Sequence, residues 1–325
     1  MNIKRMRAGA TIGVLALTVT ACGGGGTESG SGDSAEGPTV VRVAHNSNAA
    51  NLPARIAAEK GYFSADCGYE VEFTMVENIV TLPPALGRSF EIVQTAPTNM
   101  IQASSQGINM VAAAGATLDV PANPTAGVIT TEGSGITDVE QLEGKTLGVL
   151  NETGTLHTAT KFWLQKSGVD LESVEIVQID GPAQADQLLA GRVDAVETVA
   201  PFRGTILARE GTVDLGDPYL QMAPEIGAIL WGAERGWAQE NSEALDCYRA
   251  SLAKAITDIE TDEETARAVL KEYTGLPDDI VTNTVFPTYI SDVRPQDLEA
   301  WLEALQAVEN FKGDVALEDL VLDEG

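Results

Sequence analysis

The sequence predicts an α/β fold of two lobes, each built on a parallel-rich sheet flanked by helices. Short apolar strands alternate with helices, as in the strand at 146–150, the helix that follows it to Leu164, and the strand at 174–179. Alternation at this spacing implies right-handed crossovers between parallel strands. About 285 residues follow the glycine-rich N-terminal region, a length that suits two domains.

The first lobe is expected to contain four strands and three helices. Residues 69–76 show the alternation of a strand, with Val71, Phe73 and Met75 on one face. Asn51 is expected to cap the helix that Lys60 and Gly61 end. The expected strands are 39–45, 69–76, 91–95 and 108–113, and the expected helices are 52–60, 83–88 and 97–105.

The second lobe is expected to lie in the middle of the chain. Its strands are predicted at 146–150, 174–179 and 192–197, after which a strand at 227–231 and helices at 238–258, 262–273 and 295–311 complete the first lobe. The predicted division is 38–130 and 227–325 for lobe I and 131–226 for lobe II. The chain would cross twice, near Thr130 and Gly227, and double crossings act as hinges.

The N-terminal residues are typical of an export signal. Lys4, Arg5 and Arg7 precede an apolar stretch that ends in Val-Thr-Ala-Cys at Cys22, which resembles the cleavage box of bacterial lipoproteins. Residues 1–21 are therefore predicted to be a signal peptide, and Cys22 is predicted to be lipidated. Residues 22–37 are rich in Gly, Ser, Glu and Asp, so we expect a flexible tether that holds an extracytoplasmic domain at the membrane.

Charge and cysteine content narrow the function. The net charge of −28 argues against nucleic acid as a partner, because phosphate binding requires a basic face. Cys67 and Cys247 remain besides Cys22. Outside the cytoplasm an even pair favours a disulfide, and two free buried thiols are the alternative.

Three polar loops follow predicted strands, and each leads into a helix. Ligands of open α/β sheets bind at the carboxyl ends of strands, and the free N–H groups of a helix start favour anions. Thr153 or Thr155 could instead only cap its helix. The expected ligand-binding residues are His45, Asn46, Ser47, Thr95, Ala96, Thr98, Thr153, Gly154, Thr155 and His157.

Further candidates lie at the end of the last strand of the second lobe and on the returning strand: Glu197, Pro201 and Trp231. Trp231 or Phe202 could form a stacking wall for a flat heterocycle, or either could simply pack in a core. The sequence contains no cluster of metal ligands, phosphate-binding loop or nucleophile elbow. We therefore expect no catalytic residue, no cofactor and no metal.

Three stretches carry a resemblance to a known family. They are LPARIAAEKGYF at 52–63, LEGKTLGV at 142–149 with TGTLH at 153–157, and LAGRVDA at 189–195 with Pro201 after it. The chain resembles the extracytoplasmic solute-binding proteins of ABC importers, in the nitrate, sulfonate, taurine and thiamine-pyrimidine group. It departs from the family pattern at Thr153 and Gly154, and at 87–90.

The resemblance implies a two-lobed periplasmic-binding fold of the second type. It also implies a monomer that is not an enzyme, and that captures a small organic anion such as a sulfonate or carboxylate for an ABC permease and its ATPase. A thiamine-precursor pyrimidine is the alternative ligand. A sensor or adhesion module, or an enzyme on the same fold, is the alternative function.

Overall fold

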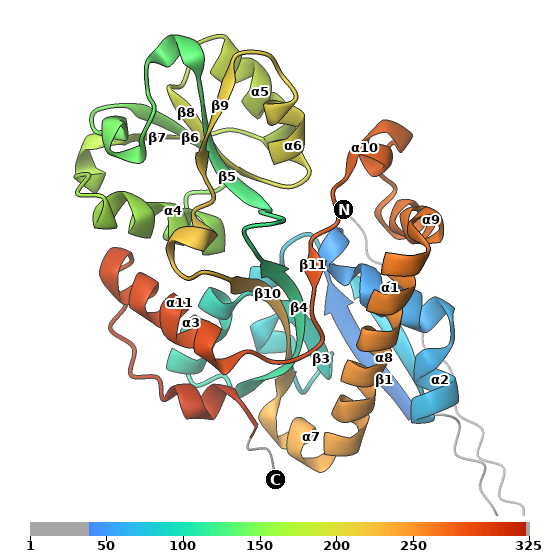
Figure 1. Ribbon diagram of the computed structural model, residues 1–325. Coiled ribbons are helices and arrows are strands. Elements are labelled where there is room, and N and C mark those ends of the chain that lie inside the picture. Colours follow the sequence, from blue (N-terminus) through green and yellow to red (C-terminus); the bar gives the residue numbers. More distant parts are fainter. Residues whose placement is uncertain (1–38, 323–325) are drawn as a thin grey trace, which may run out of the picture. The chain divides into compact units, whose positions relative to one another are not determined.

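The computed structural model describes residues 39–322, apart from the side chain of Asp279 (Figure 1). The chain divides into two units, Met1–Gly37 and Pro38–Gly325, and all described residues lie in the second. The predicted signal peptide at 1–21, the lipidated Cys22 and the tether at 22–37 lie outside the described residues.

One sheet has six strands in the order β11-β4-β10-β3-β1-β2 (Figure 1). Strand β1 pairs in parallel with β2 and β3, whereas β10 is antiparallel to β3 and β4, and β11 is antiparallel to β4. The bounds are β1 (Thr39–His45), β2 (Tyr69–Met75), β3 (Ile92–Thr95), β4 (Met110–Asp119), β10 (Ile226–Glu234) and β11 (Thr288–Tyr289).

The other sheet has five strands in the order β7-β6-β8-β5-β9. Strand β6 is parallel to β7 and β8, and β5 is antiparallel to its neighbours β8 and β9. Four strands thus run in one direction, so the prediction of parallel-rich sheets flanked by helices is confirmed. The bounds are β5 (Ala126–Thr131), β6 (Thr146–Val149), β7 (Glu175–Gln178), β8 (Ala195–Val199) and β9 (Thr212–Gly216).

Two of the antiparallel strands, β5 and β10, are the first strands that the chain forms after it crosses from one sheet to the other. Strand β5 follows β4 of the six-stranded sheet, and β10 returns from the five-stranded half. The first crossing therefore lies between Asp119 and Ala126, and its predicted position near Thr130 was wrong. Thr130 is inside β5, whose Val128 and Ile129 are fully buried. The second crossing ends at Ile226, next to the predicted Gly227.

Helices cover both faces of the six-stranded sheet (Figure 1). Trp231 and Tyr248 belong to the core on one face, and Met100 and Trp301 to the core on the other. The predicted helix at 238–258 is two helices that meet at Asn241. The helices of this half are α1 (Leu52–Glu59), α2 (Tyr62–Cys67), α3 (Pro97–Ser105), α7 (Arg235–Glu240), α8 (Ser242–Thr261), α9 (Glu263–Thr274), α10 (Asp278–Asn283) and α11 (Pro295–Val308).

The helices of the five-stranded half are α4 (Thr155–Lys166), α5 (Gly181–Leu189) and α6 (Phe202–Leu207). Ala159 and Phe162 of α4 are buried. Among residues 39–322, none of the helices combines the length and apolar character that a membrane span requires.

Both backbone polar groups of Gly227, at the second crossing, form hydrogen bonds with side chains of α11. Its N–H donates to Asp297 Oδ2 at 2.8 Å, and Trp301 Nε1 donates to its carbonyl at 2.8 Å. A Cβ at position 227 would lie 2.8 Å from the same Asp297 oxygen, so only glycine allows this approach. The start of β10 is thereby fixed to the last long helix of the chain.

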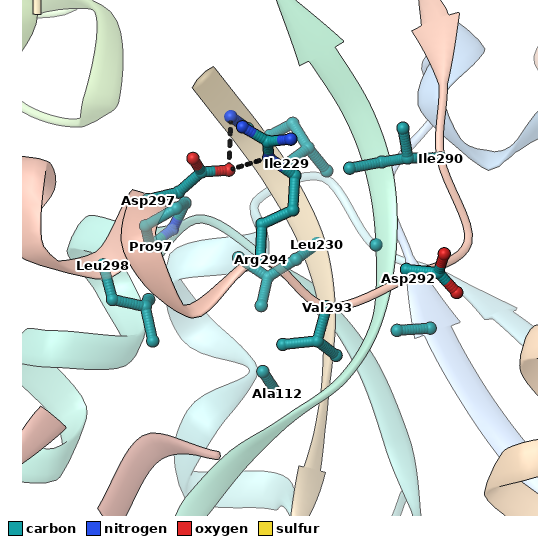
Figure 2. A pocket seen from close by; sticks show the side chains of 13 residues that line it. Pro97, Ala112, Ile229, Leu230, Ile290, Asp292, Val293, Arg294, Asp297 and Leu298 are labelled. Carbon is teal, nitrogen blue, oxygen red and sulfur yellow. Dashed lines mark hydrogen bonds and ion pairs between the residues drawn. The ribbon is translucent and has the colours of Figure 1, made fainter. Parts of the chain in front are cut away.

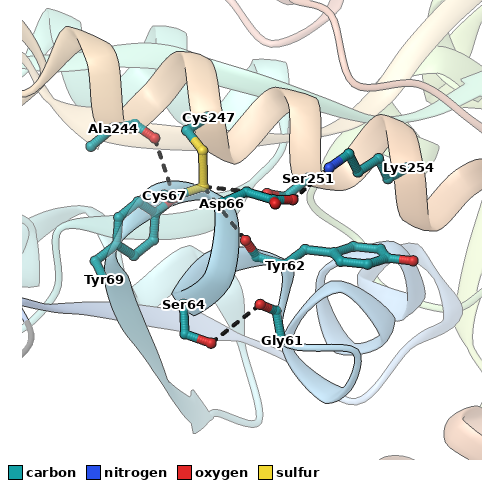
Figure 3. Close-up of a disulfide and its surroundings, with 10 residues drawn as sticks. All are labelled: Gly61, Tyr62, Ser64, Asp66, Cys67, Tyr69, Ala244, Cys247, Ser251 and Lys254. Carbon is teal, nitrogen blue, oxygen red and sulfur yellow. Dashed lines mark hydrogen bonds and ion pairs between the residues drawn. A yellow bond between two sulfur atoms is a disulfide. The ribbon is translucent and has the colours of Figure 1, made fainter.

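A disulfide joins Cys67, at the end of α2, to Cys247 in α8 (Figure 3). Tyr69, which begins β2, donates to the carbonyl of Ala244 at 3.2 Å beside it. The two cysteines are 180 residues apart in sequence. The bond therefore links the first βαβ segment to a helix that follows the second crossing.

A first prediction concerns this bond. Replacing both cysteines with alanine is expected to lower the free energy of unfolding by up to about 5 kcal/mol, because the unfolded chain gains the freedom of a very long loop. Urea denaturation of residues 38–325 measures the loss. The matched control is a thiol titration of wild-type residues 38–325, denatured but not reduced. Two reactive thiols there would contradict the pairing.

Candidate functional site

The first residues of α3 and α4 lie against each other. Helix α3 follows β3 of the six-stranded sheet, and α4 follows β6 of the five-stranded sheet. Thr98 Oγ1 and Thr155 Oγ1 are 3.0 Å apart and share a hydrogen bond. Two of the three loops that the sequence singles out are therefore joined, one from each half of the chain.

Neither helix start has a side-chain cap. The N-cap residues, Ala96 and Gly154, make no capping hydrogen bond, which leaves the first N–H groups of both helices without an intrahelical partner. Gly154 has φ 99°, a conformation that favours glycine, and a Cβ there would meet no atom within 4 Å. Thr155 is the first residue of α4 and bonds across to Thr98 rather than capping its own helix. Both N-termini carry partial positive charge, so their meeting point suits an anion.

His157 lies two residues after Thr155 in α4 and is held by Glu197 of β8. Its Nδ1 lies 3.1 and 3.2 Å from the two carboxylate oxygens, and both side chains are buried. The main-chain carbonyl of Glu197 accepts from Gln184 Nε2 at 2.8 Å. The ring nitrogen Nε2 of His157 has no hydrogen bond among the described residues and is not sealed from solvent. The contact with Glu197 uses Nδ1 and thus leaves one ring nitrogen available to a ligand.

Four buried oxygen atoms, in the loop after β1 and in residues beside Glu197, have no hydrogen-bond partner within residues 39–322. Gln184 Oε1 and Thr198 Oγ1 lie beside Glu197, and Asn46 Oδ1 and Asn51 Oδ1 lie in the loop after β1. An unpaired buried polar atom is costly, so such atoms mark places where a ligand or water binds. No pattern in the sequence pointed to Gln184 or Thr198.

The loop after β1 is organised by amides. Asn51 does not cap α1 as predicted; its Nδ2 turns back to the carbonyl of Asn46 at 2.8 Å. Gln94 of β3 accepts from the N–H of Asn46 at 3.1 Å and donates to Asn48 Oδ1 at 3.2 Å. The predicted contact Ser47 is exposed. The side chain of Gln94 in β3 thus holds the loop that follows the neighbouring strand β1.

His45 has a different role from the predicted one. It is fully buried; Nδ1 donates to the carbonyl of Asn46 at 2.6 Å, and Nε2 accepts from Arg55 Nε at 3.0 Å. Burial lowers the pKa of His45 from 6.5 to about 4, so the ring is neutral. Because both nitrogens are occupied, the structure does not support His45 as a direct ligand contact.

Several other candidates are structural. Trp231 is 1% exposed and packs edge-on against Tyr248, and the Oγ1 of Thr95 donates to the carbonyl of Ala96. A Cβ at Gly181 would lie 2.3 Å from the ring of Phe202, which shows that the ring packs directly on this glycine. Pro201 is half-buried at the start of α6, and Thr153 is exposed. Trp231 therefore provides no stacking wall.

A small cavity lies beside Pro97, the first residue of α3 (Figure 2). Its volume is about 20 Å³, room for roughly one water molecule. Asp297 accepts from Arg294 Nε at 2.9 Å on its wall. The cavity is too small for an organic ligand. No group of three or more His, Cys, Asp or Glu side chains in the described part of the chain could hold a metal ion.

A comparison with family models decides the kinship. The model described as NMT1/THI5 like matches residues 48–266, about two thirds of the chain. The chain belongs to the NMT1/THI5-like family. The suspected group is thus confirmed, and the family model covers the start of α4 and, of the loop after β1, the part from Asn48 onward. A comparison with curated protein sequences gave no match.

Solved structures share the fold of this NMT1/THI5-like chain. The periplasmic aliphatic sulphonate binding protein SsuA of Escherichia coli is 16% identical, with a TM-score of 0.74 over 88% of this chain and 93% of that one. The periplasmic nitrate-binding protein NrtA of Synechocystis PCC 6803 is 13% identical, with a TM-score of 0.66 over 86% and 84%. The alkanesulfonate-binding SsuA of Xanthomonas axonopodis pv. citri, bound to MOPS, is 14% identical, with a TM-score of 0.63 over 88% and 95%. The two-lobed periplasmic-binding fold is therefore confirmed.

A second prediction concerns His45 in this family member. The folded state disfavours its charged form, so its contribution to stability is present above pH 6.5 and is lost as the pH falls towards 4. The stability difference between the wild type and His45→Gln is expected to shrink by about 3 kcal/mol between pH 7 and pH 4.

Urea denaturation across this pH range tests the prediction. The pKa of Asp217 is raised to about 7 by burial and by Asp119, so its protonation stabilises the fold as the pH falls, opposite to the effect of His45. Asp217 is present in both proteins. Its effect cancels in the difference. A difference that stays constant with pH would show that His45 is not held neutral.

Proposed function

We propose that this chain is the substrate-binding component of an ABC importer, and that it captures a small organic anion such as a sulfonate or carboxylate. The observation that carries the proposal is the meeting of two uncapped helix starts, α3 and α4, at the hydroxyls of Thr98 and Thr155. Family membership supports the transport class, because fold alone does not establish function.

The residues around this point suit an anion. Free N–H groups at both helix starts donate to negatively charged oxygens, and each helix adds partial positive charge. His157, oriented by Glu197, presents Nε2 as a further contact. The proposed ligand residues are therefore Thr98, Gly154, Thr155 and His157, with the amides of the loop after β1.

A flat heterocycle is less well supported. Trp231, the aromatic residue proposed as its wall, lies in the core, and Phe202 covers Gly181. Ligand binding is better supported than catalysis, because among residues 39–322 no hydroxyl or thiol hydrogen-bonds a ring nitrogen of His45 or His157. A sensor that binds the same anion would use the same residues.

The proposed location is outside the cytoplasm, with the chain anchored by lipid at Cys22 and acting as a monomer with its permease and ATPase. The basic start, the apolar stretch and the lipoprotein-like box at Cys22 support this location. The acidic charge of the chain is compatible with it and gives no reason to expect nucleic acid as a partner.

A third prediction tests the ligand site. Thr155→Ala is expected to weaken the binding of a short alkanesulfonate or carboxylate by about ten- to a hundredfold, the range for losing one hydrogen bond to a charged group. Calorimetric titration measures the affinity, and thermal melting checks the fold. Thr205→Ala, an exposed threonine of α6, is the matched control. An unchanged affinity in Thr155→Ala would contradict the site.

A fourth prediction tests the anchor. Cys22→Ser is expected to release the protein from the membrane fraction or to leave its signal unprocessed, because the acylated residue is lost. Fractionation of cells followed by mass measurement of the mature chain reports both outcomes. Ser29→Ala in the same region is the control. A processed Cys22→Ser protein that stays with the membrane would show that the anchor is not at Cys22.

A further inference from the structure

Arg55 of α1 lies in an aromatic and strongly oriented setting. Its guanidinium carbon is 4.4 Å from the ring centre of Phe73 and 5.3 Å from that of Tyr273. Its Nε donates to His45 Nε2 at 3.0 Å. Two rings and a neutral imidazole therefore hold the planar group in one orientation.

Within residues 39–322, Arg55 has no carboxylate within ion-pair distance, unlike most of the other half-buried arginines. The half-buried arginines 42, 203, 249, 267 and 294 all form ion pairs with carboxylates, and Arg235 bonds a backbone carbonyl. Among residues 39–322, Arg55 is the half-buried arginine with no hydrogen bond to an oxygen atom. Glu272 attracts it from beyond ion-pair distance.

Partial burial of the unpaired Arg55 guanidinium disfavours its charged form. Burial lowers the pKa of Arg55 from its ordinary value, although Tyr273 and Glu272 oppose the shift. The chain has 48 acidic and 20 basic side chains, so carboxylates for pairing are plentiful. A cation that is partly desolvated and left unpaired in such a chain is typical of a binding site rather than of a structural role.

The terminal nitrogens of Arg55 remain available. They have no hydrogen bond with the described residues and are not sealed from solvent. The residues around Arg55 also contact the loop after β1. His45, which accepts from Arg55, donates to the carbonyl of Asn46, and the Tyr273 hydroxyl donates to the carbonyl of Asn48 at 2.7 Å. Arg55 and Tyr273 are thus both tied to the loop that holds the unpaired oxygens of Asn46 and Asn51.

We infer that Arg55 binds the anionic group of the ligand, with its two terminal nitrogens donating in parallel to a pair of carboxylate, sulfonate or sulfate oxygens. Planar guanidinium groups recognise such oxygen pairs in this bidentate way. The inference rests on the proposed function, to which it adds the residue that neutralises the charge. His45 acts as a positioning residue, since it fixes the plane of the guanidinium.

The test compares a charged organic probe with a neutral probe of the same shape, and adds inorganic sulfate as a second anion. Butanesulfonate, butanesulfonamide and inorganic sulfate are titrated into the wild type and Arg55→Gln by calorimetry. Arg55→Gln is expected to lower the affinity for butanesulfonate and for sulfate by about tenfold or more, and to leave that for the sulfonamide unchanged. Arg55→Lys keeps the charge but not the planar guanidinium, so its affinity for butanesulfonate is expected to lie between those of the wild type and Arg55→Gln. Arg88→Gln is the control, because Arg88 is exposed and forms no ion pair within residues 39–322.

The outcomes separate the two proposals. Equal binding of butanesulfonate by the wild type and a folded Arg55→Gln would overturn the role of Arg55 and leave the organic-anion function intact. Binding of sulfate that depends on Arg55, without binding of any organic anion, would support the inference and overturn the proposed function. A wild type that binds no anion overturns both.

A second measurement covers the case in which Arg55→Gln fails to fold. Phenylglyoxal labels accessible arginines, and mass spectrometry then locates the label. Butanesulfonate is expected to protect Arg55 in the wild type and to leave the labelling of Arg88 unchanged. Equal labelling of Arg55 with and without the sulfonate would contradict the inference.

Discussion

Two buried carboxylates hold the first crossing of the chain. Asp119, at the end of β4, accepts from the N–H of Thr125 at 2.9 Å, and Asp217, which follows β9, accepts from the N–H of Ala126 at 3.1 Å. Consecutive N–H groups are thus bound by one residue from each half. Burial and the neighbouring Asp119 raise the pKa of Asp217 to about 7. The start of β5, and with it the five-stranded sheet, depends on this pair.

The site follows from that constraint. Once both crossings are fixed, the strand ends that carry α3 and α4 meet, and Thr98 reaches Thr155. Local charge there opposes the charge of the whole chain: two helix starts and Arg55 provide positive potential in a protein of net charge −28. A strongly acidic composition is therefore compatible with an anionic ligand, because binding depends on the potential at the site.

Much of the fold could be predicted because it is local in origin. Apolar strands and helices such as β6 and α4 show their periodicity directly in the sequence. Strand β5 was missed although Val128, Ile129 and its threonines are typical strand residues. Its burial comes from its place between β8 and β9, which is a tertiary contact. The hydrogen bond between Thr98 and Thr155 and the unpaired oxygens of Gln184 and Thr198 depend on tertiary contacts, which a single sequence does not show.

The two histidines show where sequence reasoning reaches its limit. Both stand close to a loop at the end of a strand, and the residue type alone assigns them the same role. His157 pairs with a carboxylate through Nδ1, which leaves Nε2 open. His45 gives Nδ1 to a carbonyl and Nε2 to a guanidinium, so it has no atom left for a ligand. The partner of each ring therefore decides its role: one histidine contacts the ligand in the proposed site, and the other orients the arginine that does so.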